Sequence, residues 1–430
     1  MSKDVDNRLV CSEDKKSSIK KSIAATAERR KNQVLRVYEC KIVEKRLNKK
    51  QREQLSKLFV EGKWFYNHVL NIHQNGLSLN EINSTNIKSV EHFDKDKNKI
   101  FSELEVLSSQ EKQAIVTRMA SNERTIMSLV MKGLQKHGNL QFKSELNSIP
   151  LKQYGSTYKF KSANKVKIQG IQGTVLMRTG HQLDSVDEFA NANLVRKADG
   201  YYLKVTTFTN KENILPTEGN GKEIGLDFGI KTNITTSEGE KIDVSVEESG
   251  RLKALQRKLQ RKVNGSNNRY KTIKKIQRQY LTLMNRKKDK ANKIVSKLKK
   301  FSCIVMQDEQ ISNWQKGLFG KQVQHSCMGL IKAKLKALPQ TIVLNKWIPT
   351  TKMCPKCGSV NSISLEDRVF KCDCGYELDR DVHSAMNMVE IKNLVFSNNN
   401  FVPTEHREIT LEEFKTAVGR AYCASDKSER

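Results

Sequence analysis

The sequence lacks any apolar stretch long enough to cross a membrane. A membrane-spanning helix needs about 18 consecutive apolar residues, and no run in the 430 residues approaches that length, although 37% of them are hydrophobic. The N-terminus also lacks the apolar core of a secretory signal, since it opens with the charged segment MSKDVDNRLVCSEDKK. We therefore expect a protein that is neither embedded in a membrane nor secreted.

The cysteines do not form the framework of a disulfide-linked scaffold. Four of the nine fall into two close pairs, and the other five are scattered along the chain: Cys11, Cys40, Cys303, Cys327 and Cys423. This usage is typical of a reducing compartment. It predicts a cytoplasmic protein.

Acidic residues are scarce in one long segment. Residues 251–300 contain 19 Lys and Arg but a single acid, Asp289, and the whole chain carries a net charge of +30. A solvated helix face is the simpler explanation for a short basic run. Over so long a segment the like charges would repel one another strongly. We therefore predict a polyanionic partner, with nucleic acid as the first candidate.

The first half of the chain predicts a β-domain with a helical insert. Residues 1–31 form a polar, basic tail that we expect to be disordered. Alternation of apolar and polar residues predicts strands in 32–47 and again in 146–212. Between them, in 48–145, apolar residues recur at steps of three and four, which indicates amphipathic helices.

The second half predicts an α/β domain, so the fold class is multidomain, with α+β and α/β parts. A linker that contains Pro and Gly covers 213–221. Strands alternate with helices over 222–350, and a further helix is expected within 376–395. The paired cysteines lie between these, in 351–375, and 396–430 is a tail with no recognisable chemistry.

Three carboxylates stand where this α/β domain could bring them together. Asp227 lies on its first strand within GLDFG, Glu309 follows the apolar strand CIVMQ, and Asp381 lies at the expected start of a helix. Each alone could be an ordinary turn or capping residue, and Asp308 is an alternative to its neighbour Glu309. Three clustered carboxylates repel unless divalent cations lie among them. The pattern predicts a Mg²⁺ site for phosphodiester hydrolysis, with two ions expected and Mn²⁺ as an alternative.

The paired cysteines predict a structural zinc site. Cys354 and Cys357 form a C-x-x-C pair, and Cys372 and Cys374 form a shorter C-x-C pair; both are followed by glycine. Four thiolates on tight turns suit tetrahedral Zn²⁺, whereas a disulfide or free thiols are the alternatives. Zinc would stabilise a loop too small to have a core of its own.

Several motifs resemble those of the transposon-encoded TnpB proteins and of the miniature type V-F CRISPR effectors. They are GLDFGIKTNITTSEG, IVMQDEQISNW, KWIPTTKMCPKCGSV and FKCDCGYELDRDVHSAMNMV, and the earlier LSKLFVEGKWFYNHVLN is similar to the opening helix of both families. The resemblance is strong over about 222–392 and weaker but collinear over about 34–210.

The resemblance implies an RNA-guided DNA endonuclease with a RuvC domain of RNase H-like fold. Its catalytic, Mg²⁺-binding triad would be Asp227, Glu309 and Asp381, and a zinc ribbon would hold its metal through the four paired cysteines. The β-domain would be a barrel-like wedge and the insert a recognition region. Together these would bind a guide RNA, a short T-rich flanking motif and the guide–target duplex, with sequence read by base pairing.

The chain departs from these families at two positions, and some questions stay open. His383 and Ser384 stand where many members carry Asn and Ala. A catalytically silent, RNA-guided repressor and an unguided RuvC-like nuclease are the alternative functions. The resemblance does not separate TnpB, for which a monomer is expected, from a type V-F effector, for which two copies per guide are expected. Either would act in the cytoplasm of a bacterial or archaeal cell, at the nucleoid.

Overall fold

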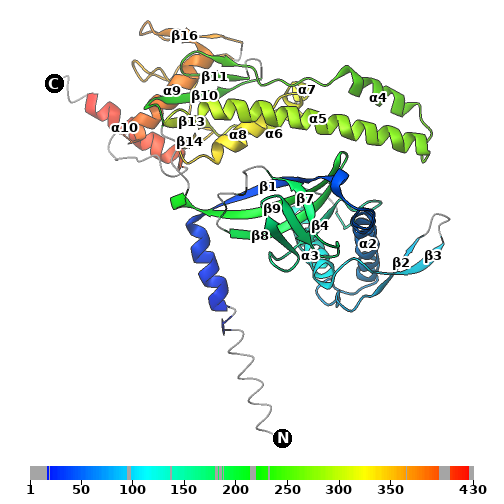
Figure 1. The fold of residues 1–430 in the computed structure, drawn as a ribbon. Helices are drawn as coiled ribbons and strands as arrows, with labels where there is room; N and C mark the ends of the chain where they lie inside the picture. The colour runs from blue at the N-terminus through cyan, green and yellow to red at the C-terminus, as the bar shows by residue number, and fades with distance from the viewer. Residues whose placement is uncertain are drawn as a thin grey trace. The chain divides into compact units, whose positions relative to one another are not determined.

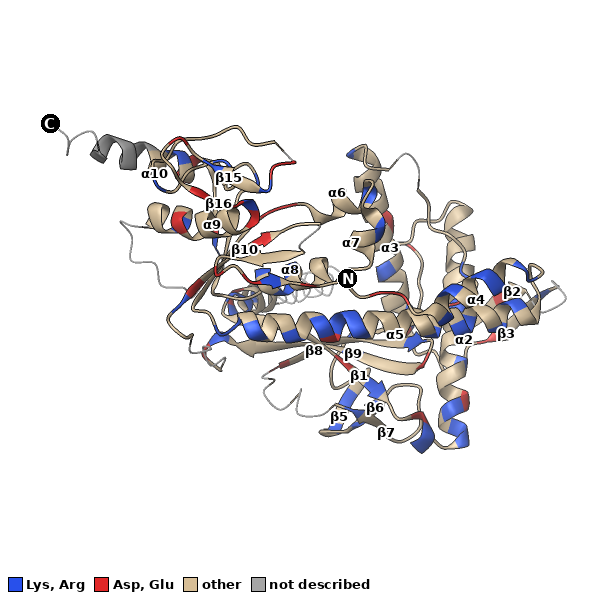
Figure 2. Cartoon of the chain, turned by 90° about the horizontal axis from the view of Figure 1, so that it is seen from above, with Lys and Arg blue, Asp and Glu red and all other residues tan. Residues whose placement is uncertain are grey.

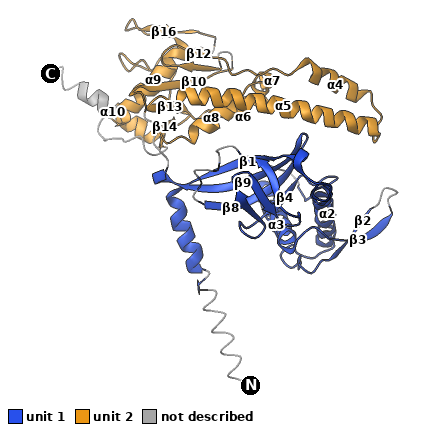
Figure 3. Ribbon diagram, in the orientation of Figure 1, with its two compact units in different colours: residues 1–215 blue, residues 216–430 orange. Residues whose placement is uncertain are grey.

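The chain folds into two compact units, Met1–Leu215 and Pro216–Arg430, in a computed structural model (Figures 1 and 3). The structure describes residues 17–18, 20–93, 98–135, 138–179, 183, 186, 188–213, 219–230, 233–364, 366–396 and 407–425. Each unit combines a sheet with helices, so the predicted multidomain α+β class is confirmed. Among the helices described, none is both long and apolar enough to cross a membrane.

The first unit is built on a seven-stranded sheet in the order β4-β8-β9-β1-β7-β6-β5. All of its pairings are antiparallel, and β1 and β9 pair from Gln33↔Asn210 to Lys41↔Tyr202. The strands are β1 (Gln33–Ile42), β4 (Ser148–Leu151), β5 (Tyr158–Ser162), β6 (Lys165–Ile168), β7 (Val175–Arg178), β8 (Glu188–Lys197) and β9 (Gly200–Asn210), with short 3₁₀ turns at Glu44–Arg46 and Lys211–Asn213.

Two helices pack into the same core as this sheet. Helix α2 (Lys49–Gln74) begins with a capping box at Asn48, and α3 (Ser109–Met131) begins with one at Ser108. The fully buried carboxylate of Glu61 on α2 accepts hydrogen bonds from the backbone N–H groups of Glu105, Val106 and Leu107. Because buried charge needs such partners, this contact fixes the loop that leads into α3. A small hairpin, β2 (Ser89–Phe93) with β3 (Lys99–Glu103), precedes that loop.

The second unit contains a six-stranded sheet in the order β12-β11-β10-β13-β14-β17. Strands β10, β13, β14 and β17 are parallel, whereas β11 and β12 are antiparallel to their neighbours. The strands are β10 (Glu223–Phe228), β11 (Ile234–Thr236), β12 (Lys241–Ile242), β13 (Cys303–Gln307), β14 (Thr341–Leu344) and β17 (Arg407–Ile409), and a separate hairpin pairs β15 (Val369–Lys371) with β16 (Glu377–Asp379).

Helices cover both faces of this sheet. The alternation along β13 shows how, because Ile304 and Met306 pack with one set of helices and Cys303 and Val305 with the other. Helices α5 (Asn267–Leu298) and α8 (Met328–Lys336) share the first core; α9 (Arg380–Phe396) and α10 (Leu411–Ser425) share the second. The remaining helices are α4 (Gly250–Gln260), α6 (Ile311–Lys316) and α7 (Gly320–Gln324).

Two regions differ from the prediction. Residues 20–31, which we expected to be disordered, are helical, because Ala, Arg and Glu in AATAERR are strong helix formers despite their charge. The predicted C-terminal tail also contributes structure: β17 extends the sheet beside β14, and Phe414 of α10 is buried in the core around α9. Residues 1–16 and 426–430 of the two predicted tails lie outside the described residues.

A carboxylate site and a four-cysteine cluster

Helix α9 lies directly on β10 because glycine leaves room for it. On the α9 face of β10, Gly225 stands between Glu223 and Asp227, and a Cβ at Gly225 would come within 1.8 Å of the Ala385 carbonyl oxygen. Any side chain there would force the helix away from the sheet. The Gly-Leu-Asp sequence therefore allows α9 to reach the Asp227 carboxylate, and Lys392 on the same helix pairs with Glu223.

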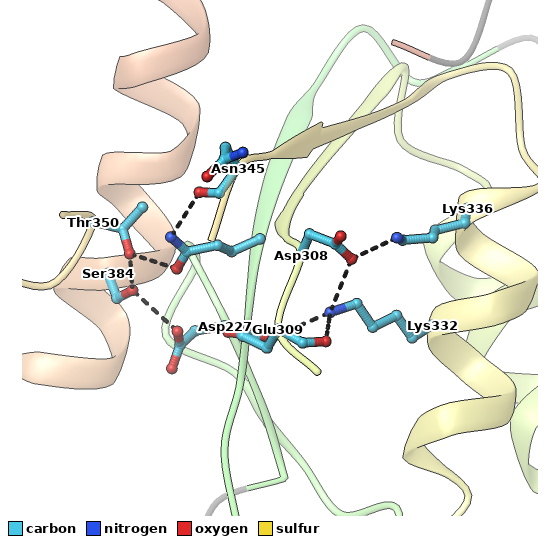
Figure 4. A network of polar contacts seen from close by, with 9 residues as sticks. Asp227, Asp308, Glu309, Lys332, Lys336, Asn345, Thr350 and Ser384 are labelled. Carbon is cyan, nitrogen blue, oxygen red and sulfur yellow. Dashed lines mark hydrogen bonds and ion pairs between the residues drawn. The ribbon is translucent and has the colours of Figure 1, made fainter. Parts of the chain in front are cut away.

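A buried chain of polar contacts leads to Asp227 (Figure 4). The Ser384 hydroxyl lies 3.0 Å from Asp227 Oδ1 and 3.2 Å from Thr350 Oγ1. The Thr350 hydroxyl lies in turn 3.0 Å from Gln307 Oε1. Gln307 is anchored through its amide, which donates to the carbonyl oxygens of Asn345 and Ile348. The carboxylate is thus held by groups from β13, α9 and the loop after β14.

The adjacent acids Asp308 and Glu309 have different surroundings. Asp308 is 46% exposed and forms an ion pair of 2.5 Å with Lys336 of α8, and this contact holds the pKa of Asp308 below its usual range. Glu309 is only 18% exposed and lies 3.5 Å from the Lys332 ammonium. Figure 4 shows Glu309 beside Asp227, with Asp308 turned toward Lys336. Of the two, Glu309 is the one whose pKa is raised by the charge of Asp227.

Asp381 reaches the site from the first turn of α9. The preceding Asp379 caps this helix, because its carboxylate accepts hydrogen bonds from the N–H groups of Asp381 and Val382. The Asp381 side chain is largely buried and lies 3.7 Å from the Arg380 guanidinium. Its charge raises the pKa of Asp227, so the two carboxylates are near neighbours.

The electrostatics of the three carboxylates favour a bound cation. Burial raises the pKa of Asp227 to about 7. The hydrogen bond from Ser384 lowers this pKa, and the charge of Asp381 raises it further. Burial also raises the pKa of Glu309 to about 8. The nearby Lys332 ammonium opposes this shift, and the charge of Asp227 adds to it. Carboxyl groups with raised pKa values are hard to ionise in the absence of a cation. A hard divalent cation, which prefers oxygen ligands, would stabilise their ionised form. The residues present therefore fit Mg²⁺.

The four paired cysteines converge at one point. Their sulfur atoms all lie within 4.8 Å of one another, with Cys354 Sγ 3.6 Å from Cys374 Sγ and Cys357 Sγ 3.5 Å from Cys372 Sγ. Gly358 and Gly375, which follow the two pairs, have left-handed φ angles of 72° and 80°. The Ser359 hydroxyl lies 3.3 Å from Cys372 Sγ, and its hydrogen bond lowers the pKa of that thiol to about 5. This geometry fits a tetrahedral zinc ion.

The cysteine cluster and the carboxylate site are joined by α9. The Asn387 amide donates to the carbonyl oxygens of Thr350 and Met353, at 2.8 and 2.6 Å, directly before Cys354. The buried His383 ring stacks on Phe370 of β15, with centroids 3.8 Å apart. The loop that carries the first cysteine pair is therefore clamped to the helix that carries Asp381 and Ser384. The sequence singled out His383 and Ser384, but Gln307, Thr350 and Asn387 have no local signal.

Three consecutive aromatic residues on α2 could serve either core packing or base stacking. Phe65 and Tyr66 are buried in the core of the first unit, and Trp64 is partly buried and stacks on His92 at 3.9 Å. In the second unit, Trp314 is partly buried and lies against the core on the α5 and α8 side of the sheet. Core packing therefore accounts for these side chains.

The basic segment forms two adjacent helices, α4 and α5 (Figure 2). Figure 2 shows Lys and Arg along both of them. A shallow surface at the end of α4 is lined by Ala254 and by four cations: Arg257, Lys258, Arg261 and Lys262. On α5, the half-exposed Tyr270 has the Lys274 ammonium 5.0 Å from its ring centroid. Clustered cations with an interspersed aromatic are typical of a surface that binds nucleic acid.

Two family models match the second half of the chain. A model described as Cas12f1-like, TNB domain, covers residues 330–388 and includes the four cysteines. A model described as Probable transposase (OrfB_IS605) covers residues 206–307 and includes Asp227.

Curated relatives also match. A Streptomyces pristinaespiralis protein named "Putative RNA-guided DNA endonuclease" is 30% identical over 190 residues, 42% of this chain and 47% of that protein. The Escherichia coli K12 protein "Putative RNA-guided DNA endonuclease InsQ" is 26% identical over 246 residues, 50% of this chain and 60% of that protein. The chain thus spans about half the length of one relative and three-fifths of the other.

A solved structure titled as a Cas12f1–sgRNA–target DNA complex matches with a TM-score of 0.44 and 14% identity, over 83% of this chain and 99% of that chain. The family models and curated relatives confirm the resemblance predicted from the sequence: the chain is similar to the Cas12f1-like and OrfB_IS605 models over 330–388 and 206–307, and to proteins named as RNA-guided DNA endonucleases.

Proposed function

We propose that this protein is an RNA-guided, Mg²⁺-dependent DNA endonuclease with one RuvC-like active site. The observation that carries the proposal is the position of Asp227 near both other carboxylates: the charge of Asp381 raises the pKa of Asp227, and the charge of Asp227 raises that of Glu309. The strand order, with three antiparallel strands followed by parallel ones, supports an RNase H-like domain. The curated relatives named as RNA-guided DNA endonucleases support the guided activity.

Asp227, Glu309 and Asp381 would hold the divalent cations, and Asp227 and Glu309, whose pKa values are raised, would have to lose their protons to do so. Bound Mg²⁺ would supply an activated water and charge stabilisation for phosphodiester hydrolysis. Ser384 orients Asp227 through its hydroxyl. Lys332, whose ammonium donates to the Glu309 carbonyl oxygen at 2.6 Å, fixes the backbone of that residue and offsets its charge. These contacts preorganise the ligand set before substrate arrives.

The second metal would have a structural role. Cys354, Cys357, Cys372 and Cys374 would bind one Zn²⁺ and hold residues 351–375 as a ribbon against α9. RuvC-like residues would then be 222–350 and 376–395, preceded by the linker 213–221. Within 396–430, β17 would complete the RuvC-like sheet as its edge strand.

The first unit would bind the guide. Its antiparallel sheet (32–47 and 146–212) would be the wedge, with 48–145 as the recognition insert, and both would contact guide RNA, a T-rich flanking motif and the guide–target duplex. The cations of α4 and α5 would neutralise phosphates. The protein would act in the bacterial or archaeal cytoplasm, as a monomer if it works as TnpB does and as a dimer if it works as a type V-F effector does.

The test is to purify the protein from cells that express its native locus and to sequence the RNA that remains bound. A discrete RNA with a constant scaffold and a variable end is expected. Target DNA that matches the variable end should then be cleaved in Mg²⁺ by the wild type and not by Asp227→Asn. Guided binding without cleavage by the wild type would favour the repressor, and cleavage without bound RNA would favour the unguided nuclease.

A further inference from the structure

An exposed tryptophan stands on the loop that follows β14, at the sheet edge that carries the carboxylates. β13 and β14 are parallel neighbours, and the Asp308 N–H donates to the Leu344 carbonyl oxygen at 2.9 Å where the two strands end. Trp347 follows Leu344 by three residues, and its side chain is 69% exposed. So large an aromatic surface beside a candidate site, on a connecting loop, points to a ligand contact.

The backbone beneath this indole is fixed. The Trp347 N–H donates to Asn345 Oδ1 at 3.0 Å, and the Ile348 N–H donates to the Asn345 carbonyl oxygen at 3.1 Å. The Gln307 amide binds the carbonyl oxygens of Asn345 and Ile348, on both sides of Trp347. Ile348 itself is buried in the core. A ring displayed on so well-anchored a loop loses little conformational freedom when a ligand packs against it.

The charge beside the ring indicates what that ligand is. The exposed Lys346 places its ammonium 4.7 Å from the Trp347 ring centroid. An aromatic face next to a cation suits a nucleotide, since the base can stack on the ring while the phosphate pairs with the ammonium. The base must be unpaired, because bases within a duplex are already stacked on both faces.

We propose that Trp347 stacks on an unpaired base of the DNA strand that enters the carboxylate site, with Lys346 at a neighbouring phosphate. The inference rests on the proposed nuclease function and adds a substrate contact to it. Gln307, the residue directly before Asp308, is hydrogen-bonded to the loop that carries Trp347. A base held on Trp347 would therefore set the position of the DNA strand relative to Asp227 and Glu309.

The test measures binding of a fluorescein-labelled oligo(dT) of about 12 nucleotides to the full-length protein in Ca²⁺ without Mg²⁺. Trp347→Leu, which keeps an apolar side chain but removes the ring, should weaken binding by about 5- to 100-fold. Trp347→Phe keeps an aromatic face and should stay within about threefold of wild type. Met131→Ala, at an exposed apolar position of the first unit, is the matched control and should bind as wild type does.

Two further readouts separate stacking from a general loss of structure. Oligo(dT) should quench the tryptophan fluorescence of the wild type, and Trp347→Phe should lose that quenching while it retains affinity. Lys346→Gln should lower the slope of log Kd against log salt by roughly 0.7, the value expected for one phosphate contact on a single strand.

The outcomes are distinguishable from a failure of the proposed function. Oligo(dT) binding by Trp347→Leu within twofold of wild type would overturn the inference, and so would a loss confined to oligo(U). If the wild type cleaves nothing with its guide but Trp347→Leu still loses oligo(dT), the stacking contact stands and the nuclease proposal falls.

Discussion

The Ser384 hydroxyl donates to Asp227 across 3.0 Å, from the second turn of a helix packed directly on the strand that carries the aspartate. A serine hydroxyl has one proton, so when Asp227 is ionised that proton points at the carboxylate. Thr350, 3.2 Å from Ser384 and 3.0 Å from Gln307, then supplies its own proton to one of those two partners. The orientation of the Asp227 carboxylate is therefore tied to a threonine on the loop that leads to the cysteines.

Thr350→Val should weaken the response to Mg²⁺, whereas Thr350→Ser should not. Valine has nearly the shape of threonine but no hydroxyl, so the chain to Asp227 is broken. Loss of such an outer contact typically lowers metal affinity by about 10- to 100-fold. The measurement is the Mg²⁺ concentration that gives half-maximal cleavage. Equal shifts for the two variants would mean that the hydroxyl has no positioning role.

Neutralising Asp308 and neutralising Glu309 should have clearly different effects on the rate of cleavage. Glu309→Gln removes a carboxylate that lies beside Asp227. If Glu309 is a metal ligand, as we propose, the variant should lower single-turnover cleavage by at least ~100-fold, because a metal ligand contributes several kcal/mol to the transition state. Asp308→Asn removes a half-exposed partner of Lys336, and such surface pairs are worth about 0–1 kcal/mol, so its rate should fall less than about tenfold. The reverse order would transfer the ligand role to Asp308.

Stabilisation by Mg²⁺ should grow as pH rises. In the metal-free protein the pKa values of Asp227 and Glu309 are raised to about 7 and about 8, so the folded state retains protons that the unfolded state releases. Without metal, stability therefore falls as pH rises from about 4 to about 8. Mg²⁺ must displace those protons, so the increase in Tm that it causes should be small at pH 6 and larger at pH 8.5. Asp227→Asn should flatten the trend, and a Tm increase independent of pH would contradict it.

The sequence predicted that Asp227 and Glu309 lie at one edge of the sheet, because parallel strands end at a common edge, and this needs only the strand pattern around GLDFG and CIVMQ. It could not find the groups that hold them. Gln307, Thr350 and Asn387 are ordinary polar residues, and Thr350 lies 43 residues from Gln307 and 34 from Ser384 in sequence. Only the folded chain brings them together.

The errors in the prediction have physical causes as well. β17 contains three residues, Arg407–Ile409, and exists because β14 offers it a parallel partner. So short a strand has no pattern of its own. The helix at 20–31 forms despite the positive charge of this segment, because Ala, Glu and Arg favour the helix.

Removal of zinc should be detectable without any activity measurement. The protein should contain one zinc ion per chain by elemental analysis, and Cys372→Ser should lose it, because its thiol is among the four that converge. Cys40→Ala, a buried cysteine in β1 of the first unit, should retain the metal. Full zinc content in Cys372→Ser would show that the four sulfur atoms are not the ligand set.

The last prediction concerns the pH dependence of the first unit. Burial raises the pKa of Glu111, in the first turn of α3, to about 7, opposed by hydrogen bonds from Ser108. Only one of its oxygens accepts those bonds, and the other is buried with no partner in the described structure. The carboxyl group is therefore best accommodated in its protonated form.

The raised pKa of Glu111 determines the direction in which stability changes with pH. Below about pH 4.5 Glu111 is protonated in both the folded and unfolded states, and as pH rises toward 7 the unfolded state releases its proton first. Stability should therefore fall across this window, by an amount on the order of 3 kcal/mol at most. Glu111→Gln keeps an acceptor for the Ser108 N–H and cannot ionise, so its melting temperature should fall less steeply than that of the wild type from pH 5 to pH 8. Glu53→Gln, at an exposed position on α2, should follow the wild type. If Glu111→Gln shows the same slope as wild type, the buried carboxyl group is not the source of the pH dependence.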